Sequence, residues 1–92
     1  MKTILVSYDL RTPETSADYK KLHEYLQGFS RWAKPLYSQY LIVTEKTVST
    51  VLDEVESLVD NNDKVLVLDV SGSGWATINL GAKVNEWMKV NI

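Results

Sequence analysis

Apolar and polar residues alternate in the first segment of the chain, from Lys2 to Asp9. A period of two is typical of a β-strand with one buried face. The two faces of this strand are Ile4, Val6 and Tyr8 on one side, and Leu5, Ser7 and Asp9 on the other. The first set is the more apolar, so we expect it to face the core and Asp9 to end the opposite face.

The next segment has a helical period. Apolar residues recur at steps of three and four, as on the buried stripe of an amphipathic helix: Tyr19, Leu22, Leu26 and Phe29. Thr15 or Ser16 is suited to cap such a helix, and Asp18 favours its positive end. We therefore predict a helix from about Ser16 to Phe29, after a loop that contains Pro13.

Residues 31–44 are rich in side chains that favour strands. One strand of this length would be unusual, and Pro35 has no N–H to donate to a central ladder. We predict two strands that meet near Tyr37, Ser38 and Gln39, with the boundary between them left open because no Asn-Gly turn marks it.

The second half of the chain contains two more helices and one strand. Valines and leucines at helical spacing predict a helix that is capped by Thr47 and stopped by residues 60–62. Residues 64–70 predict a strand, and the run of Ser and Gly at 71–74 ends it. A short final helix follows, with Asn79 as its candidate cap.

This order, β-α-β-β-α-β plus a helix, predicts an α+β protein. Two right-handed β-α-β crossovers produce a ferredoxin-like antiparallel sheet with both helices on one face. We treat residues 1–92 as one domain, with a core (1–70) and a C-terminal loop and helix (71–92). The other sheet face then carries apolar rows such as Leu41 with Val43. The C-terminal helix can cover part of it, and a homodimer that pairs sheet against sheet covers it more economically.

Composition narrows the class of protein without naming a function. The 92 residues are 45% hydrophobic and 24% charged, as in ordinary globular proteins. No apolar run is long enough to cross a membrane, and we expect a cytoplasmic protein without a signal peptide. The absence of cysteine excludes disulfides, thiolate nucleophiles and cysteine-based metal sites. The net charge of −2 argues against a chain-wide basic surface for nucleic acid.

Asp9 is the residue with the most consequential alternatives. It can accept backbone hydrogen bonds in the turn that follows the first strand. It can instead be half of a metal site, because a pair of carboxylates from two copies would hold Mg²⁺ or another divalent cation. The topology places Arg11, Ser38 and Gln39 at the same sheet edge. There Arg11 could stabilise phosphate charge and Ser38 could bind a phosphate oxygen.

The chain also resembles a known family. Four features carry the resemblance: a first strand of small hydrophobic residues that ends in Tyr8-Asp9, the chain length, the order of elements, and Ser38. In these features the chain is similar to the small CRISPR-associated nuclease-like family, the second Cas protein of spacer adaptation, and to its short SinR-like and VapD-like relatives. The resemblance covers residues 1–70. It implies a dimer in which Asp9 meets its twin, binds a divalent metal and takes part in phosphodiester cleavage of RNA or DNA.

Other readings stay open. The same fold could be a non-catalytic module for assembly with protein partners, its apolar sheet face and tryptophans serving as contacts. We expect Asp69 at the opposite sheet edge from Asp9, as a hydrogen-bond partner of the loop that begins at Ser71. We expect His23 to lie outside the buried stripe of the first helix and to be exposed.

Overall fold

The computed structural model describes residues 1–13 and 15–92. Its elements are β1 (Lys2–Asp9), the 3-10 helix η1 (Ala17–Tyr19), α1 (Lys20–Gln27), β2 (Trp32–Ala33), β3 (Gln39–Thr44), α2 (Val48–Glu56), β4 (Lys64–Asp69) and α3 (Ala82–Asn91). The four strands form one sheet in the order β2-β3-β1-β4, and all neighbouring strands are antiparallel. The predicted α+β class is confirmed.

Most predicted elements are present, with shorter bounds. The two strands expected within residues 31–44 are β2 and β3, although β2 has only two residues and ends before Pro35. Thr47 caps α2 as predicted, because its side chain accepts a hydrogen bond from the Thr50 N–H at 3.1 Å. β4 begins at Lys64 as expected.

Two helix predictions were wrong in detail. The segment predicted as one helix from Ser16 begins with the 3-10 turn η1, which Ser16 caps, and α1 ends at Gln27. Asn79 does not cap the last helix. It has a φ of 64°, and the helix begins after Gly81, whose φ is 88°. The chain turns through two left-handed positions before α3, a conformation that Asn and Gly adopt at low cost.

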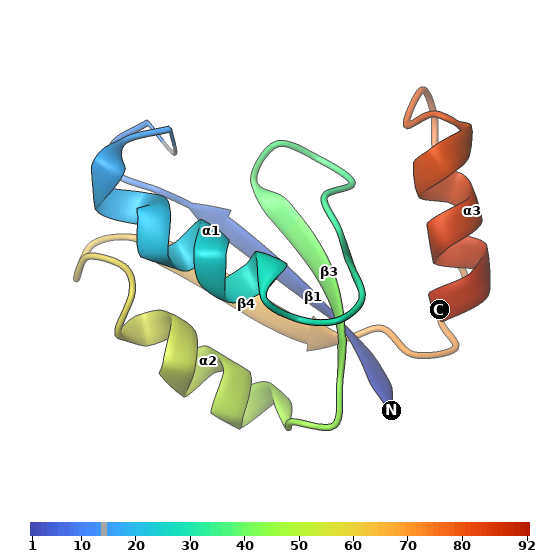
Figure 1. Ribbon diagram of the computed structural model, residues 1–92, viewed down its shortest axis with the longest axis horizontal. Coiled ribbons are helices and arrows are strands. Elements are labelled where there is room, and N and C mark those ends of the chain that lie inside the picture. Colours follow the sequence, from blue (N-terminus) through green and yellow to red (C-terminus); the bar gives the residue numbers. More distant parts are fainter. Residues whose placement is uncertain (14) are drawn as a thin grey trace.

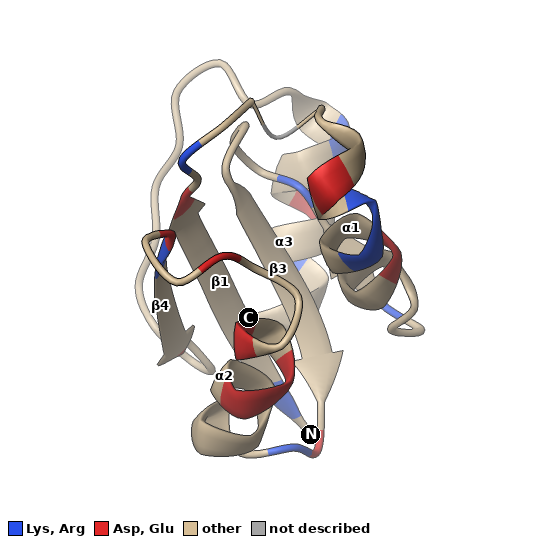
Figure 2. Cartoon of the chain, turned by 90° about the vertical axis from the view of Figure 1, so that its left-hand side faces the viewer, with Lys and Arg blue, Asp and Glu red and all other residues tan. Residues whose placement is uncertain are grey.

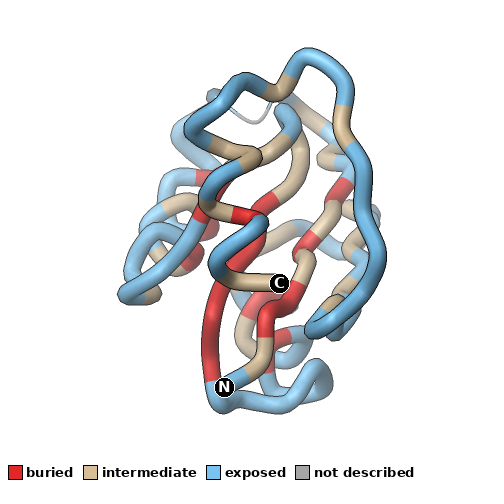
Figure 3. The backbone as a smooth tube through the Cα atoms, turned by 90° about the vertical axis from the view of Figure 1, so that its right-hand side faces the viewer, coloured by how far each residue is buried: buried red, intermediate tan, exposed pale blue. Residues whose placement is uncertain are grey.

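The main core lies between the sheet and the first two helices. Figure 1 shows α1 and α2 side by side over the sheet, and α3 apart from them. The core cluster combines alternate residues of β1 and β3 with the buried stripes of both helices: Ile4, Val6, Tyr8, Leu22, Leu26, Tyr40, Ile42, Val51 and Val55. Figure 3 shows buried positions along the strands and exposed positions on the loops. The core-facing set predicted for β1 is confirmed.

The second face of the sheet is covered on one side only. The C-terminal segment packs against β3, where Leu41 and Val43 are buried together with Met88 of α3. The Thr3 hydroxyl donates to the carbonyl of Asn91, and the Thr3 N–H donates to the Ser71 hydroxyl at 2.9 Å. The predicted partial cover by the C-terminal helix is therefore confirmed.

The β4 side of the same face stays open. Leu66 and Leu68 are 55% and 45% exposed, and β4 is an edge strand. Leu5 lies opposite Leu68, and Asp9 lies opposite Lys64 at one end of the row. We call these five residues the open strip.

Among the described residues, no helix is long and apolar enough to span a membrane.

Candidate functional site

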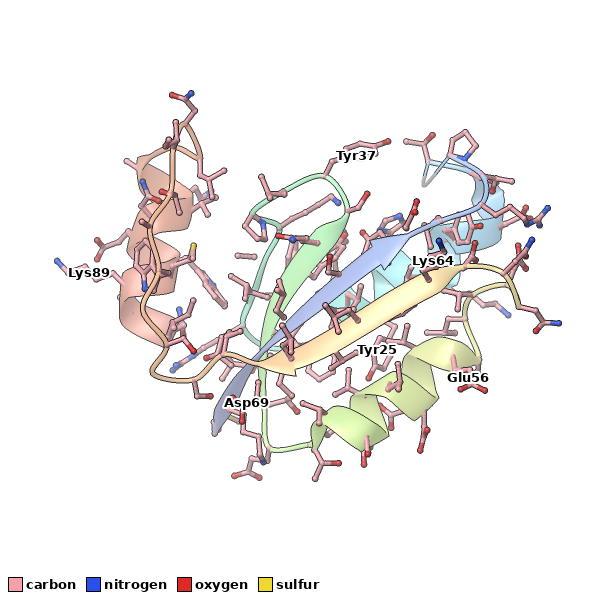
Figure 4. The ribbon with its side chains drawn as sticks, turned by 180° about the vertical axis from the view of Figure 1, so that it is seen from behind. Tyr25, Tyr37, Glu56, Lys64, Asp69 and Lys89 are labelled. Carbon is pink, nitrogen blue, oxygen red and sulfur yellow. The ribbon has the colours of Figure 1, made fainter. Side chains whose placement is uncertain are left out.

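Asp9 is exposed at the end of β1, in the open strip. Its neighbour in the sheet is Lys64, the first residue of β4; Figure 4 shows Lys64 where the two strands meet. Within the described residues, the Asp9 carboxylate has no hydrogen bond or ion pair. The strip therefore carries one negative and one positive side chain at this end.

The turn after β1 is held by a different carboxylate. Asp63, in the loop before β4, accepts hydrogen bonds from the N–H groups of Arg11 at 2.6 Å and Asp60 at 2.7 Å, and from the Tyr19 hydroxyl at 3.1 Å. Burial opposes ionisation of Asp63, but these hydrogen bonds outweigh it and lower its pKa. Asp63 therefore fills the capping role that was one alternative for Asp9.

Arg11 is paired with a carboxylate other than Asp9. Its guanidinium pairs with the Asp60 carboxylate at 2.8 Å. The hydrogen bond and charge of Asp60 raise the pKa of Arg11, which stays charged. This ion pair connects Arg11 to the α2–β4 loop. To bind a phosphate group, Arg11 would first have to break the pair with Asp60.

Ser38 and Gln39 lie where the topology predicted, beside the end of β1. The Ser38 carbonyl accepts from the Tyr8 N–H at 3.0 Å. Gln39 pairs with Ser7 in the sheet, with Nε2 3.5 Å from the Ser7 hydroxyl. Of the predicted phosphate-binding residues, Ser38 lies next to the end of β1, and Arg11 has its guanidinium paired with Asp60.

Asp69 has the structural role expected from sequence. It lies opposite Ile4, at the far end of β1 from Asp9. Its carboxylate accepts from the Ser71 N–H at 3.0 Å, and hydrogen bonds from Ser71 lower its pKa. Asp9 and Asp69 are thus separated by most of the length of β1 and belong to different sites.

A divalent cation finds no site within one described chain. No group of three or more His, Cys, Asp or Glu side chains is close enough to hold a metal among residues 1–13 and 15–92. At the open strip one carboxylate stands beside one ammonium, and a hard cation needs several oxygen ligands. The donor set of the open strip in one chain therefore does not fit such a cation.

A second group of functional side chains lies on the opposite, helix-covered side of the sheet. Its centre is Tyr40 of β3, which is only 1% exposed. The Tyr40 hydroxyl contacts Nδ1 of His23 at 3.1 Å and accepts from Nε2 of Gln27 at 2.9 Å. Both partners come from α1, so these contacts tie the helix to the sheet.

Lys34 completes this group, which we call the Tyr40 cluster: Tyr8, His23, Gln27, Lys34, Tyr37 and Tyr40. The Lys34 ammonium is 4.9 Å from the ring centroid of Tyr40, 5.3 Å from that of Tyr37 and 5.9 Å from that of Tyr8. It donates to the Tyr37 carbonyl and contacts the Tyr8 hydroxyl at 3.5 Å. Three electron-rich ring faces and these hydrogen bonds hold the cation in place.

The cluster borders a cavity of about 590 Å³. The cavity lies between η1, α1 and the β2–β3 loop. Its lining residues are Thr15, Ser16, Ala17, Lys20, His23, Glu24, Gln27, Lys34, Tyr37 and Tyr40. Its size is within the range typical of small-molecule sites, about 300–1,000 Å³.

Sequence reasoning missed this cluster. The prediction of an exposed His23 was wrong, because its ring is half-buried against Tyr40, 6.0 Å between ring centroids. One signal was available: His23 and Gln27 are four residues apart and share one helix face. The contact with a tyrosine of β3 depends on how α1 lies across the sheet, which the helical period does not specify.

The charge distribution restricts where a polyanion could bind. Figure 2 shows acidic residues gathered on α2 and the loop after it. α2 carries Asp53, Glu54 and Glu56 and no lysine or arginine. This side of the molecule repels a phosphate backbone, whereas the open strip and the Tyr40 cluster each contain a lysine.

No family model matches the sequence, and comparisons with curated proteins and with solved structures also gave no match.

Proposed function

We propose that the chain adopts the ferredoxin-like arrangement and works as a homodimer. Two facts support the fold assignment. The connection from β1 to β2 passes over the intervening β3, and the connection from β3 to β4 passes over the intervening β1. Each crossover contains a helix, α1 or α2, and both helices pack into one core. This is the split β-α-β pattern.

The open strip supports the dimer. Its exposed apolar part is Leu66 and Leu68 of β4, which the chain's own C-terminal segment leaves uncovered. Leu5 of β1 beside them is half-buried and lines a cavity with residues of that segment. At one end the strip carries a carboxylate and an ammonium side by side, Asp9 and Lys64. A surface with both signs is complementary to itself under a two-fold rotation, so a second copy is the occupant that matches its chemistry.

In this dimer we propose a nuclease-like role for Asp9, which the family resemblance also suggests. The observation that carries it is the exposed Asp9 carboxylate at the edge of the pairing surface, without a partner among the described residues. Two such carboxylates, one from each subunit, would hold a divalent cation together with water and phosphate oxygens. A cation so held activates water for attack on a phosphodiester of RNA or DNA.

The Asp9→Ala variant tests the proposed nuclease role of Asp9. Wild-type protein is incubated with labelled RNA and DNA, with Mg²⁺, with Mn²⁺ and with a chelator. We expect cleavage with metal only, and we expect the variant to fall to the chelator level because each half of the cation site is lost. The Asp53→Ala variant is the matched control, since it removes an exposed carboxylate of α2 outside the strip.

Equal background cleavage in wild type and variant would contradict the nuclease role. It would not contradict the proposed dimer, because the oligomeric state is measured separately by sedimentation.

A second candidate is a non-catalytic assembly module, and the position of Lys64 favours it. In each chain Lys64 lies beside Asp9, so Asp9 can form an ion pair with Lys64 of the partner subunit without any metal. Sedimentation with and without Mg²⁺ separates the two roles. The nuclease role predicts that Mg²⁺ tightens the wild-type dimer but not the Asp9→Ala dimer. The assembly role predicts no effect of Mg²⁺ and a weaker dimer in both Asp9→Ala and Lys64→Ala.

A further inference from the structure

We propose that the cavity between the C-terminal segment and the second face of the sheet is a binding site for a neutral aromatic compound of one ring. The cavity has a volume of about 240 Å³. Its walls come from β1, β3, the β2–β3 loop, the β4–α3 loop and α3, the helix that stands apart from α1 and α2 in Figure 1. The site is therefore separate from the Tyr40 cluster, which lies on the helix-covered side of the sheet.

The inner end of the cavity belongs to the sheet and to α3. Leu5 and Leu41 lie directly opposite each other in β1 and β3, so their side chains leave the same face of the sheet. Gln39, two residues before Leu41, belongs to that face as well. Leu41 is 3% exposed and Met88 of α3 is 8% exposed, so these two side chains mark the buried end of the cavity.

The outer end of the cavity is open to solvent. Leu36 of the β2–β3 loop and Trp75 of the β4–α3 loop both line it, and they are 52% and 40% exposed. The apolar wall thus runs from the surface to a buried end. A small ligand can reach this wall without any separation of the strands.

The wall favours a neutral ligand. Among the described residues that line the cavity there is no Lys, Arg, His, Asp or Glu side chain. The polar side chains there, Gln39, Ser73 and Thr77, are neutral, and the Thr77 hydroxyl already donates to the side-chain oxygen of Asn85 at 2.5 Å. Burial of a charge without a partner is much more costly than burial of a neutral ring. A charged ligand therefore does not match this wall.

Two wall residues favour an aromatic ring over a saturated one. Trp75 contributes an indole, and two aromatic rings attract each other by more than the area that they bury. Met88 contributes a thioether, whose sulfur makes favourable contacts with an aromatic ring. A saturated ring of the same size gains neither of these contacts.

The volume restricts the ligand to a small molecule. An apolar cavity of about 150 Å³ holds one benzene molecule, and sites for drug-sized ligands begin at about 300 Å³. The cavity lies between these two values, so it accepts one ring with a small substituent. A nucleotide or a helix of a partner protein exceeds this space.

The test is a heteronuclear NMR titration of the full chain at neutral pH with phenol, its saturated counterpart cyclohexanol, and the anion benzoate. We expect phenol to bind with a Kd of about 0.1–2 mM. Cyclohexanol lacks the aromatic contacts and benzoate carries a charge, so each should bind at least about fivefold more weakly.

The tryptophan side chains report where phenol binds. The indole N–H signal of Trp75 should shift until it saturates. The signal of Trp32 should stay in place, because Trp32 lies against Tyr40, with 5.8 Å between the ring centroids. No saturable shift of the Trp75 signal up to about 10 mM phenol, or cyclohexanol or benzoate binding as tightly as phenol, would overturn the proposal.

Leu36→Asp and Ile78→Asp are a matched pair of variants. Both replace an exposed apolar side chain with a carboxylate, but only Leu36 lines the cavity. Leu36→Asp should weaken phenol binding about fivefold or more, because a charge then stands at the mouth of the apolar wall. Ile78→Asp should bind phenol as wild type does. Equal binding by Leu36→Asp and wild type would refute this cavity as the site.

Trp75→Leu tests the aromatic class of the ligand. It should remove most of the preference for phenol over cyclohexanol, followed through the backbone N–H signals of residues 73–77. A variant that keeps the full preference would refute the contribution of the indole. Circular dichroism checks that each variant is folded, and Leu36→Asp with Ile78→Asp carries the test if Trp75→Leu is unfolded.

The cavity is complete within one chain, so the proposal does not depend on the dimer. Leu5 belongs both to the open strip and to the cavity wall, whereas Leu66 and Leu68 belong to the strip and do not line the cavity. The Leu66→Lys, Leu68→Lys double variant should therefore bind phenol as wild type does. Loss of phenol binding in this variant would overturn a site built within one chain.

Discussion

The Leu66→Lys, Leu68→Lys double variant is expected to be monomeric at concentrations where the wild type is a dimer. Both leucines are about half exposed on β4, so the substitution leaves the main core intact. In the proposed dimer, completing the burial of each half-exposed leucine contributes about 1 kcal/mol, roughly half the value for full burial, and two leucines come from each subunit. An added lysine would in addition bring an unpaired charge into the interface. We therefore expect the dimer Kd to rise by at least about a thousandfold.

Analytical ultracentrifugation over a range of concentrations measures this change. Ile78→Lys is the matched control, because Ile78 is an apolar side chain, 84% exposed and outside the open strip. The control should keep the wild-type Kd. A wild type that remains monomeric at millimolar concentration, or a double variant that remains dimeric, would contradict pairing through the strip.

Replacing Asp63 with alanine is expected to lower the free energy of unfolding by about 2–3 kcal/mol. The variant loses hydrogen bonds from two backbone N–H groups and from the Tyr19 hydroxyl. Hydrogen bonds to a charged group contribute about 1.5–3 kcal/mol each, and access of water to the loops makes the total smaller than the sum. Urea unfolding followed by tryptophan fluorescence gives the value.

The same carboxylate predicts a dependence on pH. Its folded pKa is lower than the value of 3.8 for an unperturbed aspartate. The stabilisation is therefore complete above the unfolded pKa and is lost as pH falls through the lower folded pKa. The difference in stability between wild type and Asp63→Ala should shrink in acid. Asp53→Ala should show no comparable loss of stability. A loss in Asp53→Ala as large as that in Asp63→Ala would refute the role of the hydrogen bonds to Asp63.

The patterns that could be read from sequence are those whose cause is local. The alternation in β1 assigned Ile4, Val6 and Tyr8 to the core because successive side chains of a strand point to opposite faces. Thr47 was recognised as a cap, and Ser16 was one of two candidates with Thr15, because a short side-chain oxygen reaches an N–H two or three residues ahead. Asp69 was assigned to the Ser71 loop on the same principle. In each case the partners are close along the chain.

The site residues show the opposite case. Arg11 lies two residues from Asp9, yet it pairs with Asp60, 49 positions away. The capping carboxylate of that turn is Asp63, 52 positions from Arg11. The pattern of the first helix alone predicted an exposed His23. In the structure its ring is half-buried against Tyr40 of β3. These partners meet only because the α2–β4 loop and α1 lie where the packed sheet places them.

The sequence by itself determined the elements, their order and the apolar face of each, because hydrophobic period and capping act over a few residues. Tertiary structure decided the rest. The path of residues 71–92 covers the β3 side of the second sheet face and leaves the β4 side open, which exposes Asp9 with Lys64. The position of α1 across β3 builds the Tyr40 cluster. Both outcomes depend on contacts between residues far apart in the chain, and no local pattern encodes which of several carboxylates or aromatic rings will meet.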